Sequence, residues 1–268
     1  MDMDPRVRRR YEVYDEDQRL RRPGLGDLVR LRTWDIFDRY VPTGVRVADI
    51  GGGPGIHADR LARGDREVLL FDPMPGHVEI ARGRGTFQAE IAEARQVPLD
   101  DASVDVVLLM GPLYHLVEPE DRLAALREAA RVLRPGGLIL AEIITRYAWV
   151  MDATGKGLLG EPGTWDDFDW IARTGVSKDP DQVVDGSFFA YFHRPEELRA
   201  ELTQAGFEDV ELLAVEGFAG LFGDLAERMR EPGDLLRALR ITEAEPSMLG
   251  ASAHVLGLAR SCPNPASR

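Results

Sequence analysis

The feature that most constrains the fold is a regular alternation of apolar runs with helix-like segments between residues 45 and 144. The apolar runs are short and rich in β-branched residues, which is typical of strands that are buried on both faces. They occupy residues 45–50, 67–72, 86–91, 104–110 and 138–144. The intervening segments combine helix-forming residues with apolar positions at helical spacing. The longest is predicted to be a helix that begins at Glu120 and is stopped by Pro135 and Gly136. This alternation predicts a parallel sheet with right-handed crossovers and helices on both faces.

Charge and composition exclude several classes of protein. The chain has 46 acidic and 33 basic residues and a net charge of −13, and an acidic surface repels phosphate backbones and anionic membranes. No window approaches the roughly 20 apolar residues of a membrane span, and the N-terminal residues lack the apolar core of a signal peptide. The single Cys262 cannot form an internal disulfide. We therefore expect a cytoplasmic protein that binds neither nucleic acid nor membrane.

A glycine-rich loop follows the first expected strand. Gly51, Gly53 and Gly55 form a G-x-G-x-G pattern between that strand and a helix. Without side chains, such a loop turns tightly and lets a ligand touch the backbone, and the following helix offers free N–H groups. Asp72 ends the next strand, 21 residues after Gly51. This is the spacing of an acid that hydrogen-bonds a ribose diol.

The neighbours of the loop bear on the ligand class. A dinucleotide fingerprint requires G-x-G-x-x-G, and this chain has Ile56 where the third glycine would stand. Asp49 lies just before the loop, where a carboxylate suits a cationic ligand better than a pyrophosphate. The loop therefore favours a nucleoside with a positively charged group.

Together these motifs give the chain a family resemblance. The sequence resembles the class I S-adenosylmethionine-dependent methyltransferases in VADIGGGPG (47–55), FDP with Asp72, AEARQVP (92–98), VVLLMGPLYHL (106–116) and LREAARVLRPGG (126–137). The C-terminal FHRPEEL, AGF and EPSMLGASAH are similar to a subgroup of bacterial small-molecule methyltransferases. The resemblance implies S-adenosylmethionine as cofactor and S-adenosylhomocysteine as product.

The resemblance also implies which residues hold the cofactor. Asp49 would face the methionine ammonium, and Asp72 would hold both ribose hydroxyls. Glu93 would receive the adenine amino group. The implied binding residues are Asp49, Gly51, Gly53, Asp72, Met74, Glu93, Ala94, Met110 and Gly111. From the N-terminal arm, Tyr14 is expected, with Tyr11, to cap the cofactor carboxylate.

The expected fold is an α/β, doubly wound, mostly parallel seven-stranded sheet of the Rossmann-like methyltransferase type. Residues 1–44 are predicted to form an N-terminal helical arm or cap, and 45–144 the cofactor-binding core. Residues 145–192 break the alternation and are predicted to be a helical lid insertion. Residues 193–262 are predicted to form the C-terminal part of the same domain.

Methyl transfer depends mainly on alignment and on the exclusion of water. His115 and Tyr114, just after the strand at 104–110, are the candidates for a catalytic base or a group that positions the acceptor. Glu142 is a second candidate for a ligand-side group. His57, His193 and His254 are interpreted as structural, and His254 as part of the core. No spacing of histidines resembles a metal site, so no metal is expected.

The expected reaction is methyl transfer to the O, N or C nucleophile of a small molecule. A nicotinamide-dependent reductase is an alternative, but both lysines, Lys156 and Lys178, lie in the insertion and no Tyr-x-x-x-Lys pair exists. A non-catalytic module that binds S-adenosylmethionine or S-adenosylhomocysteine also stays open. The oligomeric state is open too, a homodimer included.

Overall fold

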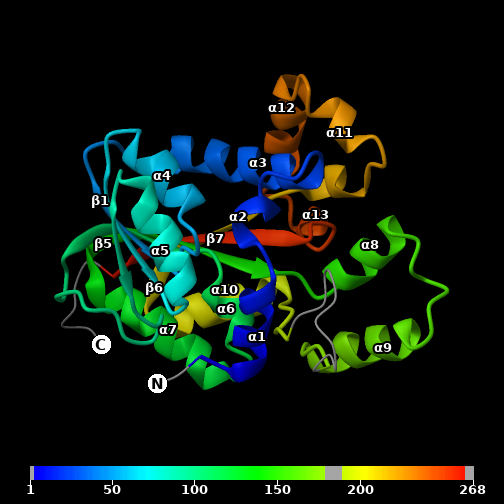
Figure 1. Cartoon of the computed structure of the whole chain (residues 1–268), viewed down its shortest axis with the longest axis horizontal. Coiled ribbons are helices and arrows are strands. Elements are labelled where there is room, and N and C mark those ends of the chain that lie inside the picture. The colour runs from blue at the N-terminus through cyan, green and yellow to red at the C-terminus, as the bar shows by residue number, and fades with distance from the viewer. Residues whose placement is uncertain (1–2, 179–188, 263–268) are drawn as a thin grey trace.

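The computed structural model describes residues 3–178 and 189–262, and a seven-stranded sheet lies at the centre of this part (Figure 1). The strand order is β3-β2-β1-β4-β5-β7-β6. The strands are β1 (Arg46–Ile50), β2 (Glu67–Asp72), β3 (Gln88–Ile91), β4 (Val104–Leu109), β5 (Leu133–Ile144), β6 (Phe207–Ala214) and β7 (His254–Ser261). Strands β1 to β5 are parallel, and β7 runs antiparallel between β5 and β6. The predicted doubly wound, mostly parallel sheet is confirmed.

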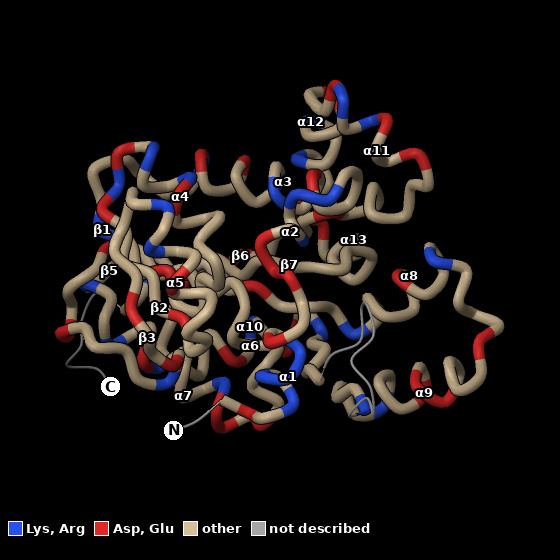
Figure 2. Tube along the Cα trace, in the orientation of Figure 1, with Lys and Arg blue, Asp and Glu red and all other residues tan. Residues whose placement is uncertain are grey.

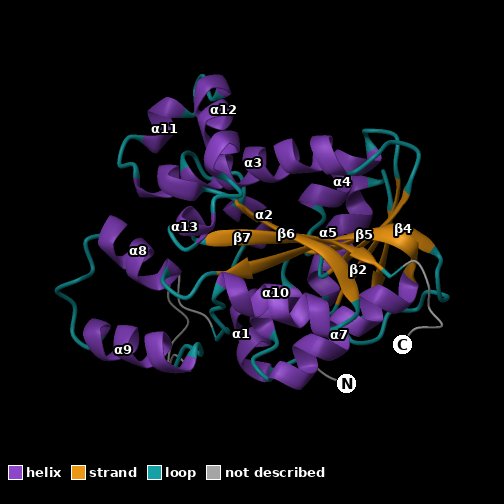
Figure 3. Cartoon of the chain, turned by 180° about the vertical axis from the view of Figure 1, so that it is seen from behind, coloured by secondary structure: helices purple, strands orange, loops and turns teal. Residues whose placement is uncertain are grey.

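Helices cover both faces of the sheet (Figures 1 and 3). On one face lie α3 (Leu25–Tyr40), α4 (Ile56–Ala62) and α5 (Pro75–Arg84), and on the other lie α7 (Pro119–Val132) and α10 (Pro195–Gln204). Each set buries its own apolar core against the sheet. Ile36, Leu61 and Val78 belong to the first core, and Leu126 and Leu198 belong to the second.

One predicted strand boundary is wrong. The helix expected to stop at Pro135 ends at Val132, and β5, expected to begin at Leu138, already begins at Leu133, which pairs with Val104 of β4. Arg134 precedes Pro135, and a residue before proline disfavours helical backbone. The register shifts between Val104 and Val106, so the Arg-Pro-Gly-Gly segment is accommodated as an irregularity inside the strand.

The N-terminal arm contains α1 (Pro5–Val13) and α2 (Glu16–Arg19). Helix α1 begins with proline at its first turn, and the Asp4 side chain accepts a hydrogen bond from the Arg6 backbone at 2.8 Å. These are the usual features of a helix start. The short helix α6 (Pro112–His115) lies after β4. The phenol of Tyr11 meets the His115 ring at 2.7 Å, which ties the arm to α6.

Two further groups of helices flank the end of the sheet. Helices α8 (Ala148–Gly155) and α9 (Thr164–Thr174) project beyond it, as Figure 3 shows. Ala148 and Ile171 of this insertion pack with Tyr114 and Ile144. After β6 come η1 (Gly217–Leu221), α11 (Leu225–Arg228), α12 (Gly233–Thr242) and α13 (Pro246–Leu249). Within the described ranges, no helix combines the length and apolar character needed to cross a bilayer.

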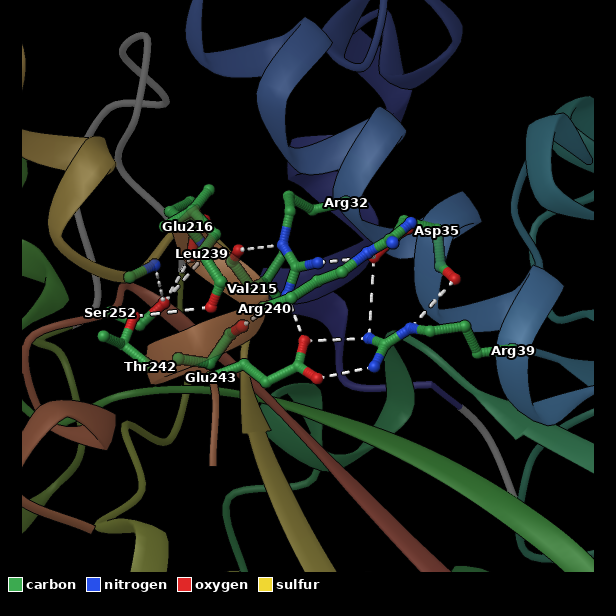
Figure 4. Close-up of polar contacts among 12 residues, drawn as sticks. Arg32, Asp35, Arg39, Val215, Glu216, Leu239, Arg240, Thr242, Glu243 and Ser252 are labelled. Carbon is green, nitrogen blue, oxygen red and sulfur yellow. Dashed lines mark hydrogen bonds and ion pairs between the residues drawn. The ribbon is translucent and has the colours of Figure 1, made fainter. Parts of the chain in front are cut away.

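A buried ion network fastens α3 to the C-terminal helices (Figure 4). Arg32, fully buried, lies 2.6 Å from both Asp35 and Glu243. Arg39 and Arg240 pair with the same two carboxylates. Arg32 also donates to the backbone carbonyls of residues 214 and 215. The network thereby fixes the chain where it leaves β6.

Candidate active site

Two adjoining cavities lie at the carboxyl ends of the parallel strands, where folds of this kind bind ligands. The first measures about 300 Å³. Every cofactor-binding residue that the sequence predicts lines it, apart from Tyr14. These residues are Asp49, Gly51, Gly53, Asp72, Met74, Glu93, Ala94, Met110 and Gly111. The residues that the sequence assigns to one site therefore surround one cavity in the fold.

The backbone of the glycine loop is open to a ligand at one position, Gly53. Gly51 and Gly55 have positive φ, and a Cβ on either would lie 2.5 Å from Pro112 or Phe87, so both are needed for the chain's own packing. Gly53 also has positive φ (+55°), but a Cβ there would meet no heavy atom closer than 4.0 Å. The space at Gly53 belongs to the cavity. A ligand can approach the backbone there.

Asp72 holds this loop in place. Its carboxylate accepts from the Gly53 backbone N–H at 2.9 Å and from the Met74 N–H at 2.9 Å. It also lies 3.1 Å from Nδ1 of His77. A carboxylate has about four acceptor positions, so Asp72 keeps capacity for a further donor from a ligand. His77 is a contact that sequence reasoning missed, although it follows Asp72 by only five residues.

Asp49 is a buried acid without a partner. Its carboxyl group has 0% exposure, and among the described residues neither oxygen has a hydrogen bond. Burial, together with nearby Asp72, raises the pKa of Asp49 to about 7. An unpaired buried carboxylate is costly unless a ligand supplies a cation or donor. The site therefore fits the ammonium of an amino acid.

The far edge of the first cavity carries Glu93 and two buried apolar residues. Glu93 pairs with Arg95 at 2.8 Å, and Arg95 pairs with Asp121 at 2.7 Å. Ala94 and Met74 are buried beside them. This wall offers an acid and an apolar surface, which a purine ring requires.

His115 and Tyr114 lie at the junction of the cavities and line both. The Nε2 atom of His115 is engaged by Tyr11, and burial, with Arg10 nearby, lowers the pKa of His115 to about 3. Tyr114 donates to the Met110 carbonyl at 3.4 Å, and burial raises its pKa. Both side chains therefore stay neutral at physiological pH.

The second cavity, of about 490 Å³, lies between the N-terminal arm, helix α8 and the start of β7. It shares Tyr11, Glu16, Arg19, Val29, Tyr114 and His115 with the first. Tyr14, expected to cap the cofactor, lines this second cavity instead. The reason is local: α1 ends at Val13, so Tyr14 has extended backbone and stacks with Arg10.

Charged side chains near the junction include Glu16 and Arg19, which sequence reasoning did not single out, and Glu142, which it did. Arg19 pairs with Glu16 at 2.5 Å beside both cavities. Glu142, near the end of β5, lines the first cavity, and burial raises its pKa to about 7. His254, expected in the core, lines the second cavity and contacts buried Glu216.

The remaining histidines have structural contacts. The Trp34 indole N–H donates to Nδ1 of His57 at 3.2 Å, and burial lowers the pKa of His57 to about 3. His193 is fully buried and lies 3.4 Å from Glu201. Within residues 3–178 and 189–262, no group of three or more His, Cys, Asp or Glu side chains is placed to hold a metal.

Comparison with known proteins shows what this part of the chain is similar to. Residues 47–137 match the family model described as a methyltransferase domain. The chain is 37% identical over 123 residues to an uncharacterised methyltransferase of Mycobacterium tuberculosis (strain ATCC 25618 / H37Rv). It is 35% identical over 116 residues to the tRNA (carboxymethyluridine(34)-5-O)-methyltransferase ALKBH8 of Mus musculus.

These matches cover only part of each protein. The first spans 44% of this chain and 49% of the mycobacterial relative, and the second spans 43% of this chain and 16% of the mouse relative. The fold extends further. A crystal structure of a SAM-dependent methyltransferase from Methanosarcina mazei covers 85% of this chain and 98% of that one, with a TM-score of 0.59 and 18% identity.

Proposed function

We propose that the chain is an S-adenosylmethionine-dependent methyltransferase that transfers a methyl group from this cofactor to a small-molecule acceptor. The match of residues 47–137 to a methyltransferase domain and the similarity to a mycobacterial methyltransferase support this proposal. S-adenosylmethionine, when bound, supplies a methyl group on a positively charged sulfur. The first cavity is the proposed cofactor site. The second cavity is the proposed acceptor site.

The first cavity offers a matching group for each part of the cofactor. Asp49 would pair with the methionine ammonium, and the open backbone at Gly53 would lie against the methionine portion. Asp72 would accept from the ribose hydroxyls. Glu93 and the backbone of Ala94 would receive the adenine, with Met74 packed against it. Met110 and Gly111 would hold the methionine end.

The arm and the lid would exclude water from the reacting groups. Tyr11 of α1, hydrogen-bonded to His115, lies at the junction of the two cavities. A site closed in this way strengthens electrostatic interactions and prevents hydrolysis. Tyr114 and His115 are proposed to position the acceptor, because both line the two cavities and stay neutral.

A small acceptor is favoured by the size of the second cavity and by charge. A cavity of about 490 Å³ accommodates a drug-sized molecule. Lys and Arg are interspersed with Asp and Glu along most of the elements in Figure 2, whereas nucleic-acid recognition requires a basic face. A tRNA acceptor, suggested by the name of the mouse relative, therefore ranks second.

The observation that carries the proposal is the unpaired carboxylate of Asp49 inside the glycine-loop cavity. Calorimetry tests it: S-adenosylhomocysteine is expected to bind the wild type at micromolar concentration, and NADH is not. Asp49→Ala is expected to lose this binding. The matched control Asp38→Ala, an exposed acid of α3 outside both cavities, is expected to keep it. Binding of NADH but not of S-adenosylhomocysteine would overturn the proposal.

A further inference from the structure

His254 occupies a position that suits proton transfer. It is the first residue of β7 and lies opposite Ile144 of β5 in the sheet register. Its side chain is 18% exposed and lines the second cavity. The Nδ1 atom contacts a carboxylate oxygen of Glu216. The two residues are 38 positions apart and meet because β6 and β7 are neighbours.

Glu216 is fixed on every side. It has 0% exposure, and its second oxygen accepts from the Ser252 hydroxyl at 2.8 Å and from the His254 N–H at 2.9 Å. Ser252 in turn accepts from the backbone N–H groups of Glu216 and Gly217. Figure 4 shows Ser252 joined to Glu216, and Arg32 bonded to Val215, the residue before Glu216. This carboxylate therefore cannot turn away from His254.

The fixed carboxylate determines the tautomer of the imidazole. A neutral His254 must carry its proton on Nδ1 to donate to Glu216, so Nε2 keeps a lone pair and acts as an acceptor. Nε2 is not among the buried polar atoms without a partner, and no described residue bonds to it. It is therefore open to the cavity.

The charges around His254 support a base that works near neutral pH. Burial opposes the imidazolium, but the carboxylate of Glu216, with Glu142 of β5, outweighs burial and raises the pKa of His254; Arg19 acts in the opposite direction. Arg10, Arg22 and the ion pair of Lys156 with Asp152 also line the cavity. His115 is a poorer base, because Tyr11 already engages its Nε2 and burial lowers its pKa to about 3.

The rest of the cavity indicates the acceptor. Its wall is mainly apolar and aromatic, with Trp149, Met151, Ile144, Tyr114 and Phe192. Such a wall binds an aromatic ring system, and a carboxylate-held histidine is the arrangement that activates a hydroxyl nucleophile.

We propose that His254 is the general base that removes the proton from a phenolic hydroxyl in the second cavity, with Glu216 as its positioning residue. In this step the acceptor oxygen forms its bond to the transferred methyl carbon, and the bond from that carbon to the donor sulfur breaks. The acceptor proton moves to Nε2 of His254, and the positive charge ends on the imidazolium. The inference rests on the proposed function.

NMR of the ligand-free protein tests the geometry independently of activity. In ¹⁵N-histidine-labelled wild type, neutral His254 is expected to be the Nδ1–H tautomer with a pKa above that of a free histidine. In Glu216→Gln the amide would donate to Nδ1, so the tautomer is expected to switch to Nε2–H and the pKa to fall. A wild-type Nε2–H tautomer would overturn the proposal.

Methylation of two phenol probes at pH 8 tests the chemistry. 2-Naphthol is largely un-ionised at this pH and needs a base, whereas 4-nitrophenol is largely ionised and does not. His254→Gln is expected to lower kcat for 2-naphthol by about 100-fold or more, the usual contribution of a general base, and for 4-nitrophenol by less than about 5-fold. The Glu216→Gln variant is expected to show the same two changes in kcat as His254→Gln. The matched control His193→Gln, a buried histidine outside both cavities, is expected to leave the ratio of the two rates unchanged.

The outcomes separate this inference from the proposed function. Equal losses on both probes would reduce His254 to a structural residue and overturn the proposal. Wild type that binds S-adenosylhomocysteine but methylates neither phenol would overturn the phenolic acceptor while leaving the cofactor site intact. Failure to bind S-adenosylhomocysteine would instead overturn the proposed function. If His254→Gln does not fold, two measurements still test the proposal: the tautomer of His254 in the wild type, and the ratio of the 2-naphthol and 4-nitrophenol rates in Glu216→Gln.

Discussion

Replacement of Asp49 by asparagine is expected to stabilise the ligand-free protein while abolishing its affinity for the cofactor. The pKa of Asp49 is raised to about 7 in the fold, against 3.8 in an unfolded chain. A raised acid pKa means that the folded state binds more protons, so this group's contribution to stability falls as the pH rises from about 4 to 7. The amide of the variant carries no charge and escapes this loss.

The size of the effect follows from the two pKa values. Each pKa unit corresponds to about 1.4 kcal/mol, so the penalty of charged Asp49 grows by about 3 kcal/mol between pH 5 and pH 8. The difference in unfolding free energy between Asp49→Asn and wild type is expected to increase by that amount. Urea denaturation of both proteins at several pH values measures it. A pH-independent difference would show that Asp49 is paired in the folded protein and would refute the reasoning.

Cofactor binding is expected to depend on the ionisation of Asp49 as well. Pairing with an ammonium lowers the pKa of Asp49, so binding of S-adenosylhomocysteine is expected to release about half a proton at pH 7 and about nine-tenths at pH 6. Affinity is expected to fall by about 100-fold from pH 8 to pH 5. Calorimetry in buffers of different ionisation enthalpy counts the protons, and proton uptake on binding would contradict the assignment.

Three further changes probe other parts of the structure. Asp72→Asn removes charge-assisted hydrogen bonds, and calorimetry is expected to show S-adenosylhomocysteine binding weakened by about 1–3 kcal/mol; unchanged affinity would mean that the ribose lies elsewhere. Arg32→Leu leaves buried carboxylates under-compensated and is expected to cost about 3 kcal/mol of unfolding free energy, measured in urea; a neutral result would show the network to be dispensable. Tyr11→Phe removes the hydrogen bond between arm and α6 and is expected to cost about 1 kcal/mol and to speed proteolysis of the arm; equal proteolysis rates would contradict a fastening role.

Much of the fold was predictable because its signals are local. The glycine loop and Asp72 belong to one strand–turn–helix–strand unit, so their spacing alone brought them to the same cavity. The start of β5 was not predictable in this way. The segment from Leu133 to Gly137 follows a good helix and contains Pro and Gly, which favour a turn, and only pairing with Val104 makes it part of the sheet.

The proposed cofactor cavity and the proposed acceptor cavity differ in how far their residues can be predicted from the sequence. Asp49 and Asp72 could be found from sequence because they lie at the carboxyl ends of neighbouring strands of the parallel sheet, one residue before the end of β1 and at the end of β2. His254 and Glu216 could not, because nothing near either residue in the sequence indicates the other. Their contact depends on the antiparallel placement of β7 between β5 and β6. The roles of these residues stay predictions until the experiments above are done.

Acidic groups in or beside each of the two cavities favour a positive charge, and one reaction would account for both. In the first cavity, burial and the nearby charge of Asp72 raise the pKa of Asp49, and a bound cation would lower it again. In the second, Glu216 and Glu142 favour a proton on His254. Methyl transfer to a hydroxyl removes positive charge from the donor sulfur and creates it on the base. Under the proposed function, the protein would stabilise positive charge in the first cavity before the reaction and in the second cavity after it, which is the division that a phenolic acceptor requires.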